Sequence, residues 1–284
     1  MVELFLRYEF LQNALYAGIL IGFLAPLLGV FLVVRRLSLI ADALSHIALA
    51  GIAASLFIGK TWPQLPVAGP YSMGMFFSVI GSLLIEKLRT AYTYYKEIAI
   101  PIILSGGIGL SVVFLSLANG FNNDLFQYLF GTVMAVSRQD VWTITVITGF
   151  VFIVIVLFFK ELFFLSFDED QAIVSGINRK LVHFIFIVMV ALVIVVSMRI
   201  VGILLVSALM TLPVAAAMRF AKGFKQLFVY SIVFGELSVI VGLISAFYLD
   251  VVPGGMIVMV AVCILLLSLT VKTTIKRKKV DLYD

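Results

Sequence analysis

Long apolar stretches, separated by short polar loops, follow one another along the whole sequence. A helix needs about 20 mostly apolar residues to cross a bilayer. In lipid, the backbone polar groups must be paired within a helix or a closed barrel. Charged residues form 12% of the chain, about half the share found in an ordinary soluble domain. We therefore predict an all-α integral membrane protein with a single transmembrane domain over residues 1–284.

The apolar stretches predict a polytopic bundle of eight or nine transmembrane helices. The nine candidate spans are 11–34, 39–59, 71–86, 98–118, 139–159, 181–199, 201–218, 227–248 and 254–271. The third is short, and the sixth and seventh meet at Met198 and Arg199, so one of these could be irregular or re-entrant. Pro213 is expected to break the backbone ladder of the seventh. The segment from Asp124 to Val136 is too short to cross alone, which favours an interfacial or half-membrane helix.

Lysine and arginine are distributed unevenly between alternate loops. If the amino terminus lies outside, 16 of the 20 basic residues fall on the inner side and 4 on the outer side. This bias is the one expected of a chain whose carboxyl tail, 272–284, is cytoplasmic. The net charge of +5 then reflects membrane topology, and no nucleic-acid partner is predicted. The basic tail could contact anionic membrane lipid, although a plain inside anchor is the simpler interpretation.

Three acid or histidine residues lie inside the predicted spans, away from their ends: Asp42, His46 and Glu236. A charge at mid-membrane costs at least ~2.5–3.5 kcal/mol, so such residues are expected to face the bundle interior and to have a partner. Asp42 and His46, at i and i+4, share one face of a helix and lie ~6 Å apart along its axis. A carboxylate and an imidazole that converge suit a divalent cation. Glu236 could supply a second carboxylate from another span.

Two other interpretations of these groups remain open. They could hydrogen-bond one another or neighbouring helices, with Asp42 paired to Arg35 or Arg36 near the inner surface. They could also form a proton relay, since chains of acids and histidines mark proton paths in membranes. The only other histidine, His183, begins the sixth span near its cytoplasmic end.

The run RRLSLIADALSHIALAG, from Arg35 to Gly51, closely resembles the signature of permease subunits from bacterial ABC importers for zinc and manganese. Three further stretches resemble the same family in the same order: DLFQYLFGTVMAV, SFDEDQAIVSGI and VGILLVSALMTLPVAAAM. The resemblance extends over essentially the whole chain. It implies a homodimeric permease of the bacterial plasma membrane, with a cytoplasmic ABC ATPase subunit and an extracellular metal-binding protein as partners. It also implies that the chain is not an enzyme and has no cofactor, because the metal ion is its substrate.

Two positions depart from the family pattern. Many members carry proline where Ala50 stands, and manganese-type relatives tend to carry a histidine where Ile240 stands. Overall similarity favours the zinc branch, with manganese or iron as alternatives. From another class, a proton-coupled secondary metal carrier could use the same acids. An intramembrane metalloprotease is disfavoured, because the sequence has no His-Glu-x-x-His.

The segment 166–177, SFDEDQAIVSGI, falls in an inner loop of the predicted topology. Acids in the first turn of a short helix favour its positive amino-terminal end, and Gly176 provides a stop. By composition, a solvated and well-capped loop helix is the simpler interpretation. The resemblance instead implies a cytoplasmic coupling segment that docks on the ATPase, with Phe167, Asp168, Ala172 and Gly176 as its motif.

Two residues near the outer ends of spans are candidates for an outer gate. Arg199 could repel cations or pair with lipid phosphate, and Asp250 could receive an ion, although an acid before Pro-Gly is more often turn chemistry. The sequence IGKT, 58–61, is not a phosphate-binding loop, because Ala54 stands where that motif needs a glycine. ATP hydrolysis is therefore expected on a separate subunit.

Overall fold

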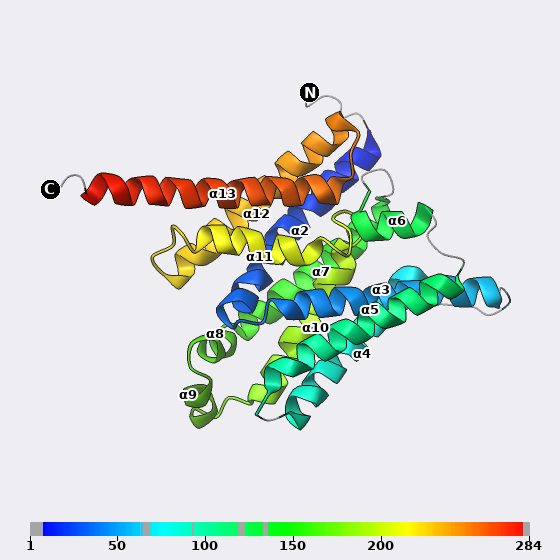
Figure 1. The fold of residues 1–284 in the computed structure, drawn as a ribbon, viewed down its shortest axis with the longest axis horizontal. Coiled ribbons are helices and arrows are strands. Elements are labelled where there is room, and N and C mark those ends of the chain that lie inside the picture. The colour runs from blue at the N-terminus through cyan, green and yellow to red at the C-terminus, as the bar shows by residue number, and fades with distance from the viewer. Residues whose placement is uncertain are drawn as a thin grey trace.

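The computed structural model describes residues 8–62, 64, 69–92, 94–118, 123–132 and 136–280, and these form helices joined by short turns (Figure 1). Eight of the helices are long and apolar enough to cross a membrane. They are α2 (Glu9–Val34), α3 (Leu39–Thr61), α4 (Pro70–Ala91), α5 (Ala99–Leu117), α7 (Arg138–Leu157), α10 (Arg179–Ser197), α12 (Phe224–Leu249) and α13 (Pro253–Val280). The predicted class, a polytopic all-α membrane protein, is confirmed.

Shorter helices lie at the ends of the bundle or complete a pass through it. They are η1 (Lys96–Ile98), α6 (Asn123–Phe130), α8 (Phe159–Phe167), α9 (Glu169–Val174) and α11 (Val206–Ala217). Helix α6 lies before α7 in the chain, and helices α8 and α9 lie after it. The two ends of α7 therefore mark opposite ends of the bundle, here named the α6 end and the α9 end (Figure 1). Residues 133–135 of the expected half-membrane segment, and the last four positions of the expected tail, lie outside the described residues.

The seventh predicted span is the irregular one. Helix α10 ends at Ser197, residues 198–205 form turns, and α11 has only 12 residues, which is about 18 Å of helix. The break precedes α11, and the helix continues through Pro213 rather than ending there. The hydropathy of 201–218 could not reveal this, because a buried turn in a membrane protein is as apolar as a helix.

The turns before α11 are held by main-chain bonds to α6. The amide of Thr132 donates to the carbonyl of Arg199 at 2.9 Å, and the amide of Ile203 donates to the carbonyl of Tyr128 at 2.9 Å. These bonds pair the groups that the broken helix leaves free, which is the condition for non-helical backbone at membrane depth. They also place the start of this broken pass at the α6 end.

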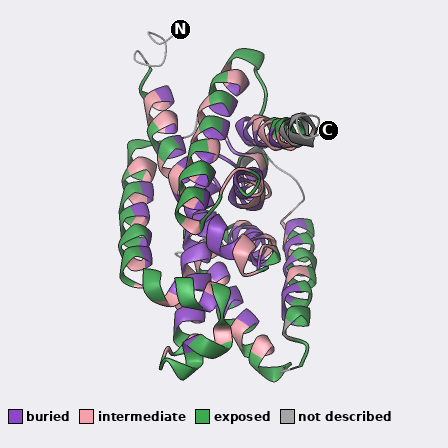
Figure 2. Cartoon of the chain, turned by 90° about the vertical axis from the view of Figure 1, so that its left-hand side faces the viewer, coloured by how far each residue is buried: buried purple, intermediate pink, exposed green. Residues whose placement is uncertain are grey.

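The bundle has a central layer and a peripheral layer. In α2, α3 and α10, at least 72% of the residues in the membrane-crossing stretch are buried. In α4, α5, α7 and α13, at most 28% of these residues are buried. Figure 2 shows the same contrast, with buried residues concentrated on the helices in the middle of the bundle. The helix that carries Asp42 and His46, α3, is therefore a central one.

Candidate functional site

Asp42 and His46 lie in the first two turns of α3, at the α9 end of this helix. The helix is continuous through both positions, so the expected i, i+4 arrangement on one face is present. Both side chains are half-buried, whereas Ser45 between them is buried. The two groups thus share one partly accessible face of a central helix.

Glycine contacts fix the position of this part of α3. A Cβ on Gly107 of α5 would lie 3.0 Å from the amide nitrogen of Ile47 and 3.2 Å from the carbonyl carbon of His46. A Cβ on Gly51 would lie 2.5 Å from the carbonyl oxygen of Met73 in α4. The distance at Gly51 is too short for a real side chain, and those at Gly107 are tighter than most Cβ contacts, so these glycines allow α4 and α5 to approach α3 closely. The sequence interpretation missed Gly107, whose only signal was the small-residue run SGGIG.

Glu236 lies on a different seam of the bundle. A Cβ on Gly22 of α2 would lie 3.2 Å from its Oε2 atom, and one on Gly235 would lie 2.7 Å from the carbonyl oxygen of Gly22. The carboxylate is half-buried between α2 and α12. Glycines on both helices therefore create the space that this acid occupies.

In the single chain, the three predicted ligands Asp42, His46 and Glu236 do not form a cluster. Among the described residues, no three His, Cys, Asp or Glu side chains lie close enough to hold one metal ion. Helix α3 packs against α4, α5, α10 and α11, whereas α12 packs against α2, α11 and α13. Asp42 and His46 are brought together by their helix, and Glu236 is not brought to them. The shared site stays a prediction.

The structural alternative for Asp42, a bond to a nearby arginine, is not what the structure contains. Arg35 directs its guanidinium group to His183, with 3.1 Å between Nη2 and Nδ1, and its Cζ lies 5.4 Å from the centre of the Phe186 ring. Within the described part of the chain, Asp42 makes no ion pair with Arg35 or Arg36.

The segment 166–177 forms the short capped helix that was predicted. The Asp168 side chain accepts from the amide of Gln171 at 2.9 Å. At the other end, Gly176 has a φ of +85°, and the amide of Ile177 donates to the carbonyl of Ala172. This is the bonding of a left-handed glycine cap. The helix α9 is therefore well defined, and its coupling role stays a prediction.

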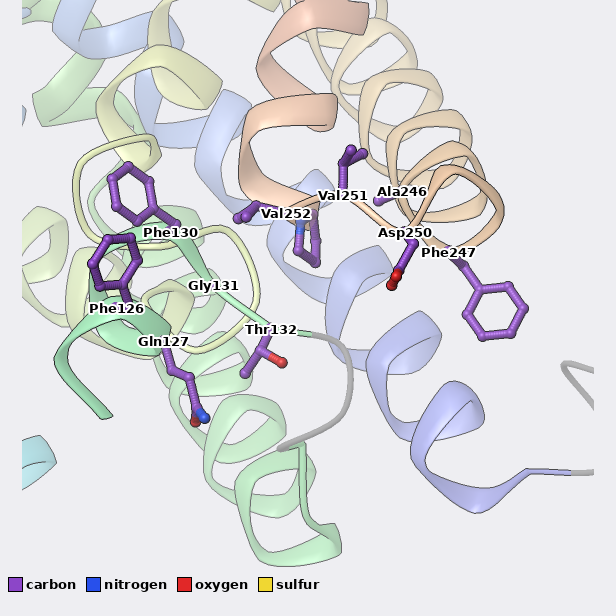
Figure 3. Close-up of a pocket in the computed structure, with 11 residues that line it drawn as sticks. Phe126, Gln127, Phe130, Gly131, Thr132, Ala246, Phe247, Asp250, Val251 and Val252 are labelled. Carbon is purple, nitrogen blue, oxygen red and sulfur yellow. The ribbon is translucent and has the colours of Figure 1, made fainter. Parts of the chain in front are cut away.

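The two candidates for an outer gate lie at the α6 end in different surroundings. Arg199 donates from Nη1 to Asp140 at 2.6 Å, and Asp140 also accepts from the Ser137 amide at 3.0 Å as part of the α7 cap. Arg199 therefore has a protein partner. Asp250, with a left-handed φ of 52°, lines an open cavity of about 310 Å³ between α6 and the α12–α13 turn, opposite Gln127 (Figure 3).

The family model described as the ABC 3 transport family matches residues 7–272. The chain belongs to this family. A "probable metal transport system membrane protein" of Treponema pallidum is 35% identical over 92% of this chain and 95% of its own length. "Manganese import system permease protein ScaB" of Streptococcus parasanguinis is 31% identical, over 96% of this chain and 94% of its own length. The solved structure "PsaBC from Streptococcus pneumoniae in complex with Fab" superposes with a TM-score of 0.81 at 29% identity, covering 94% and 93% of the two chains.

Membership of the ABC 3 family confirms the resemblance drawn from the Arg35–Gly51 run. It also confirms that the chain is a permease of the cell membrane rather than an enzyme, with ATP hydrolysis on a separate subunit. Several of the relatives are named for metal transport, so the chemistry of the α3 site is the next question.

Proposed function

We propose that this ABC 3 family chain is the membrane subunit of an ATP-driven importer of a divalent metal ion, and that the ion is zinc. The observation that carries the proposal is the pair of Asp42 and His46 on one face of a central membrane helix, held by close glycine contacts. A carboxylate oxygen and an imidazole nitrogen together suit first-row divalent ions. Both retain exposed surface with which to reach an ion.

The same exposure supports a homodimer. Asp42, His46 and Glu236 are half-buried in the single chain, and a charged side chain facing lipid costs at least ~2.5–3.5 kcal/mol. A second copy that covers these faces, leaving a path for the ion between the two copies, removes that cost. In this arrangement Glu236 supplies the further carboxylate, and the complete ligand set forms only in the assembly or in one of its transport states.

The choice of zinc rests on overall similarity to the zinc branch of the family. An imidazole and two carboxylates are compatible with it, because zinc accepts both nitrogen and oxygen ligands. Zinc also binds mixed nitrogen and oxygen sites more tightly than manganese does. Ile240 removes the additional histidine of manganese-type relatives. Manganese is the alternative, because ScaB and other relatives are named for its import.

Helix α9 and the end of α8 are proposed to dock on the ATPase subunit. Val174 is 88% exposed, Phe167 61% and Ile173 48%, while Ala172 is fully buried and holds α9 against the bundle. Exposed apolar side chains beside a capped helix at the end of a bundle are typical of a protein-binding surface. The α9 end then faces the cytoplasm, in agreement with the lysine and arginine bias of the loops.

The α6 end then faces outward and receives the ion from an extracellular metal-binding protein. Asp250, in the cavity of Figure 3, is proposed as the first carboxylate that the ion meets, with Arg199 nearby as the second candidate for this gate. ATP binding and hydrolysis on the partner drive opening of the two ends in turn. Affinity at Asp42 and His46 must be moderate, because a transported ion also has to leave.

The test uses the complete complex of permease, ATPase and binding protein in vesicles, with radiolabelled zinc and manganese. Asp42→Asn and His46→Gln keep side-chain size and are expected to reduce ATP-dependent uptake at least tenfold. Glu9→Gln, in an exposed pair with Arg138, is the control that removes a carboxylate elsewhere. Wild-type uptake by both site variants would refute the site, and uptake without ATP would favour the proton-coupled carrier. If the complex takes up manganese in preference to zinc when both are present, the choice of ion is refuted and the transport function stands.

A further inference from the structure

His183 is buried between two guanidinium groups at the α9 end of the bundle. Its side chain is 3% exposed. Arg35 approaches the Nδ1 atom at 3.1 Å, Arg89 contacts the Nε2 atom, and a carboxylate oxygen of Glu86 lies 3.5 Å from the same Nε2 atom. These four residues are named the His183 cluster.

The His183 cluster joins the structural elements that coupling would have to connect. Arg35 is the carboxyl-terminal cap of α2, Arg89 and Glu86 belong to the last turns of α4, and His183 lies near the start of α10. At the first position of α10, Arg179 forms an ion pair with Glu169 of α9. This ion pair connects α9 to the start of α10, one turn before His183.

The cluster is also connected to the α3 site through a short, well-ordered turn. The amide of Leu37 donates to the carbonyl of Leu32 at 2.7 Å, and Arg36 adopts the left-handed conformation. Helix α3 begins two residues after Leu37, and Asp42 lies in its first turn. Arg35 is therefore joined by a short turn to the amino-terminal turn of α3, which carries Asp42.

Proton counting shows that the His183 ring alone cannot accept a hydrogen bond from both arginines at once. A guanidinium group only donates hydrogen bonds, and a neutral imidazole has a single acceptor nitrogen. If Nδ1 is the acceptor, His183 accepts from Arg35 and its Nε2–H faces Glu86. If Nε2 is the acceptor, His183 accepts from Arg89 and its Nδ1–H faces Arg35, which has no acceptor to offer.

One donor and one acceptor of the His183 cluster are left unpaired. Nη1 of Arg35 and Oε2 of Glu86 are both buried without a hydrogen-bond partner. Burial, followed by the charge of Arg89, lowers the pKa of Arg35 to about 10, so its guanidinium group remains charged at neutral pH. The donors are permanent, and one acceptor has to be shared between two of them. Such an arrangement has two alternative pairings rather than one optimum.

We propose that His183 is a positioning residue for coupling, which exchanges its one acceptor nitrogen between Arg35 and Arg89 as the α9 end moves. In one state it holds the α2–α3 turn to α10, and in the other it releases that turn and holds α4. The inference rests on the proposed function, because it assigns α9 to the ATPase and Asp42 to the ion. It adds the physical connection between them.

A carboxylate at position 183 separates this role from simple structural support. Unlike imidazole, it accepts from both arginines simultaneously. We expect His183→Glu to retain or raise the thermal midpoint of the purified complex. We also expect at least a tenfold loss of metal uptake per ATP hydrolysed, because neither arginine is released. His183→Leu, which removes the acceptor, is expected to lose uptake per ATP as well.

A matched pair of arginine variants provides the control. Arg35→Gln removes a donor of the cluster, whereas Arg36→Gln removes the same charge from the exposed next residue. We expect loss of uptake per ATP for Arg35→Gln only. Uptake per ATP within twofold of wild type in both His183→Glu and Arg35→Gln would overturn the inference. Failure of the proposed function has a different signature, because the wild-type complex itself would then show no ATP-dependent uptake of zinc or manganese.

Discussion

The two ends of the bundle are held together by different kinds of contact. At the α6 end, main chain meets main chain: a Cβ on Gly254 would overlap the carbonyl oxygen of Val201, and Gly131 and Gly202 have φ values of +79° and +83° at the contact of α6 with the turns before α11. At the α9 end, side chains make the contacts. The Phe224 ring lies 5.9 Å from Phe31 and 5.0, 5.3 and 4.9 Å from three further rings, Phe163, Phe167 and Phe228.

This difference indicates which end can rearrange at low cost. At the α6 end, the main-chain hydrogen bonds form in only one relative position of the two segments. A shift of either segment would leave amide and carbonyl groups unpaired in an apolar environment. Phenylalanine rings have several edge and tilted arrangements of similar energy, and the His183 cluster has two pairings. The α9 end, proposed to receive the ATPase, is therefore the adaptable end, and the α6 end is the fixed one.

The largest effect is expected from a side chain at the α6 contact. Gly254→Val places a Cβ on the Val201 carbonyl and within 2.6 Å of the Phe130 carbonyl oxygen, which no rotamer relieves. We expect loss of folded permease from the membrane, measured by yield and monodispersity after extraction. Gly255→Val is the control, because no atom lies within 4 Å of a Cβ at that next position. Equal yields of the two variants would show that the α6 end is not fixed.

A smaller effect is expected at the ring cluster of the α9 end. Phe224→Ala removes a half-buried ring, and we expect a loss of about 2 kcal/mol in stability, below the 3–5 kcal/mol of a fully buried phenylalanine. The variant should still fold and bind the ATPase, because the remaining rings can repack. Thermal unfolding in detergent measures the change, with Phe150→Ala, 55% exposed on α7, as the control. Complete loss of folded protein would contradict an adaptable α9 end.

Local signals in the sequence were sufficient to predict the α9 helix. Asp168 caps it and Gly176 ends it, and both effects act within a few residues along the chain. The spans were predicted for a similar reason, since hydropathy depends only on the residues within each stretch. These features depend on no distant contact.

The contacts that could not be predicted join residues far apart in the sequence. Gly22 makes room for Glu236, and Gly107 makes room for the backbone at His46. Nothing in the sequence distinguishes these glycines from Gly106. In the structure, however, no atom lies within 4 Å of a Cβ at Gly106. Helix α11 packs against both α3 and α12, so the distance from Asp42 to Glu236 depends on how α11 separates these helices. For this reason the ligand types could be chosen from the sequence and their distances could not.

An intermediate loss of stability at the α6 end would show that side-chain contacts also contribute to the stability of this end. Asp140 bonds to Arg199 with side-chain exposures of 16% and 30%, and it also closes the cap of α7. We expect Asp140→Asn to lower stability by about 1–2 kcal/mol, because it removes the charge from a partly buried ion pair and weakens the charge-assisted bond of the α7 cap. Glu9→Gln, whose pair with Arg138 is exposed by 65% and 82%, should cost under about 0.5 kcal/mol. Thermal midpoints of the two variants measure the difference, and equal midpoints would contradict it.

The smallest predicted effect is a gain at the α9 end. Arg36 has a φ of 57° in the turn between α2 and α3, a conformation that glycine adopts without cost. Arg36→Gly and Arg36→Ala remove the same charge, but only glycine relieves the strain, so we expect Arg36→Gly to be more stable by about 1 kcal/mol. The difference between their thermal midpoints measures this strain. A turn that merely connects two helices would keep full transport in the glycine variant. A turn that must hold Arg35 against His183 would lose part of its uptake per ATP there, because a more flexible residue 36 transmits less of the movement to Asp42.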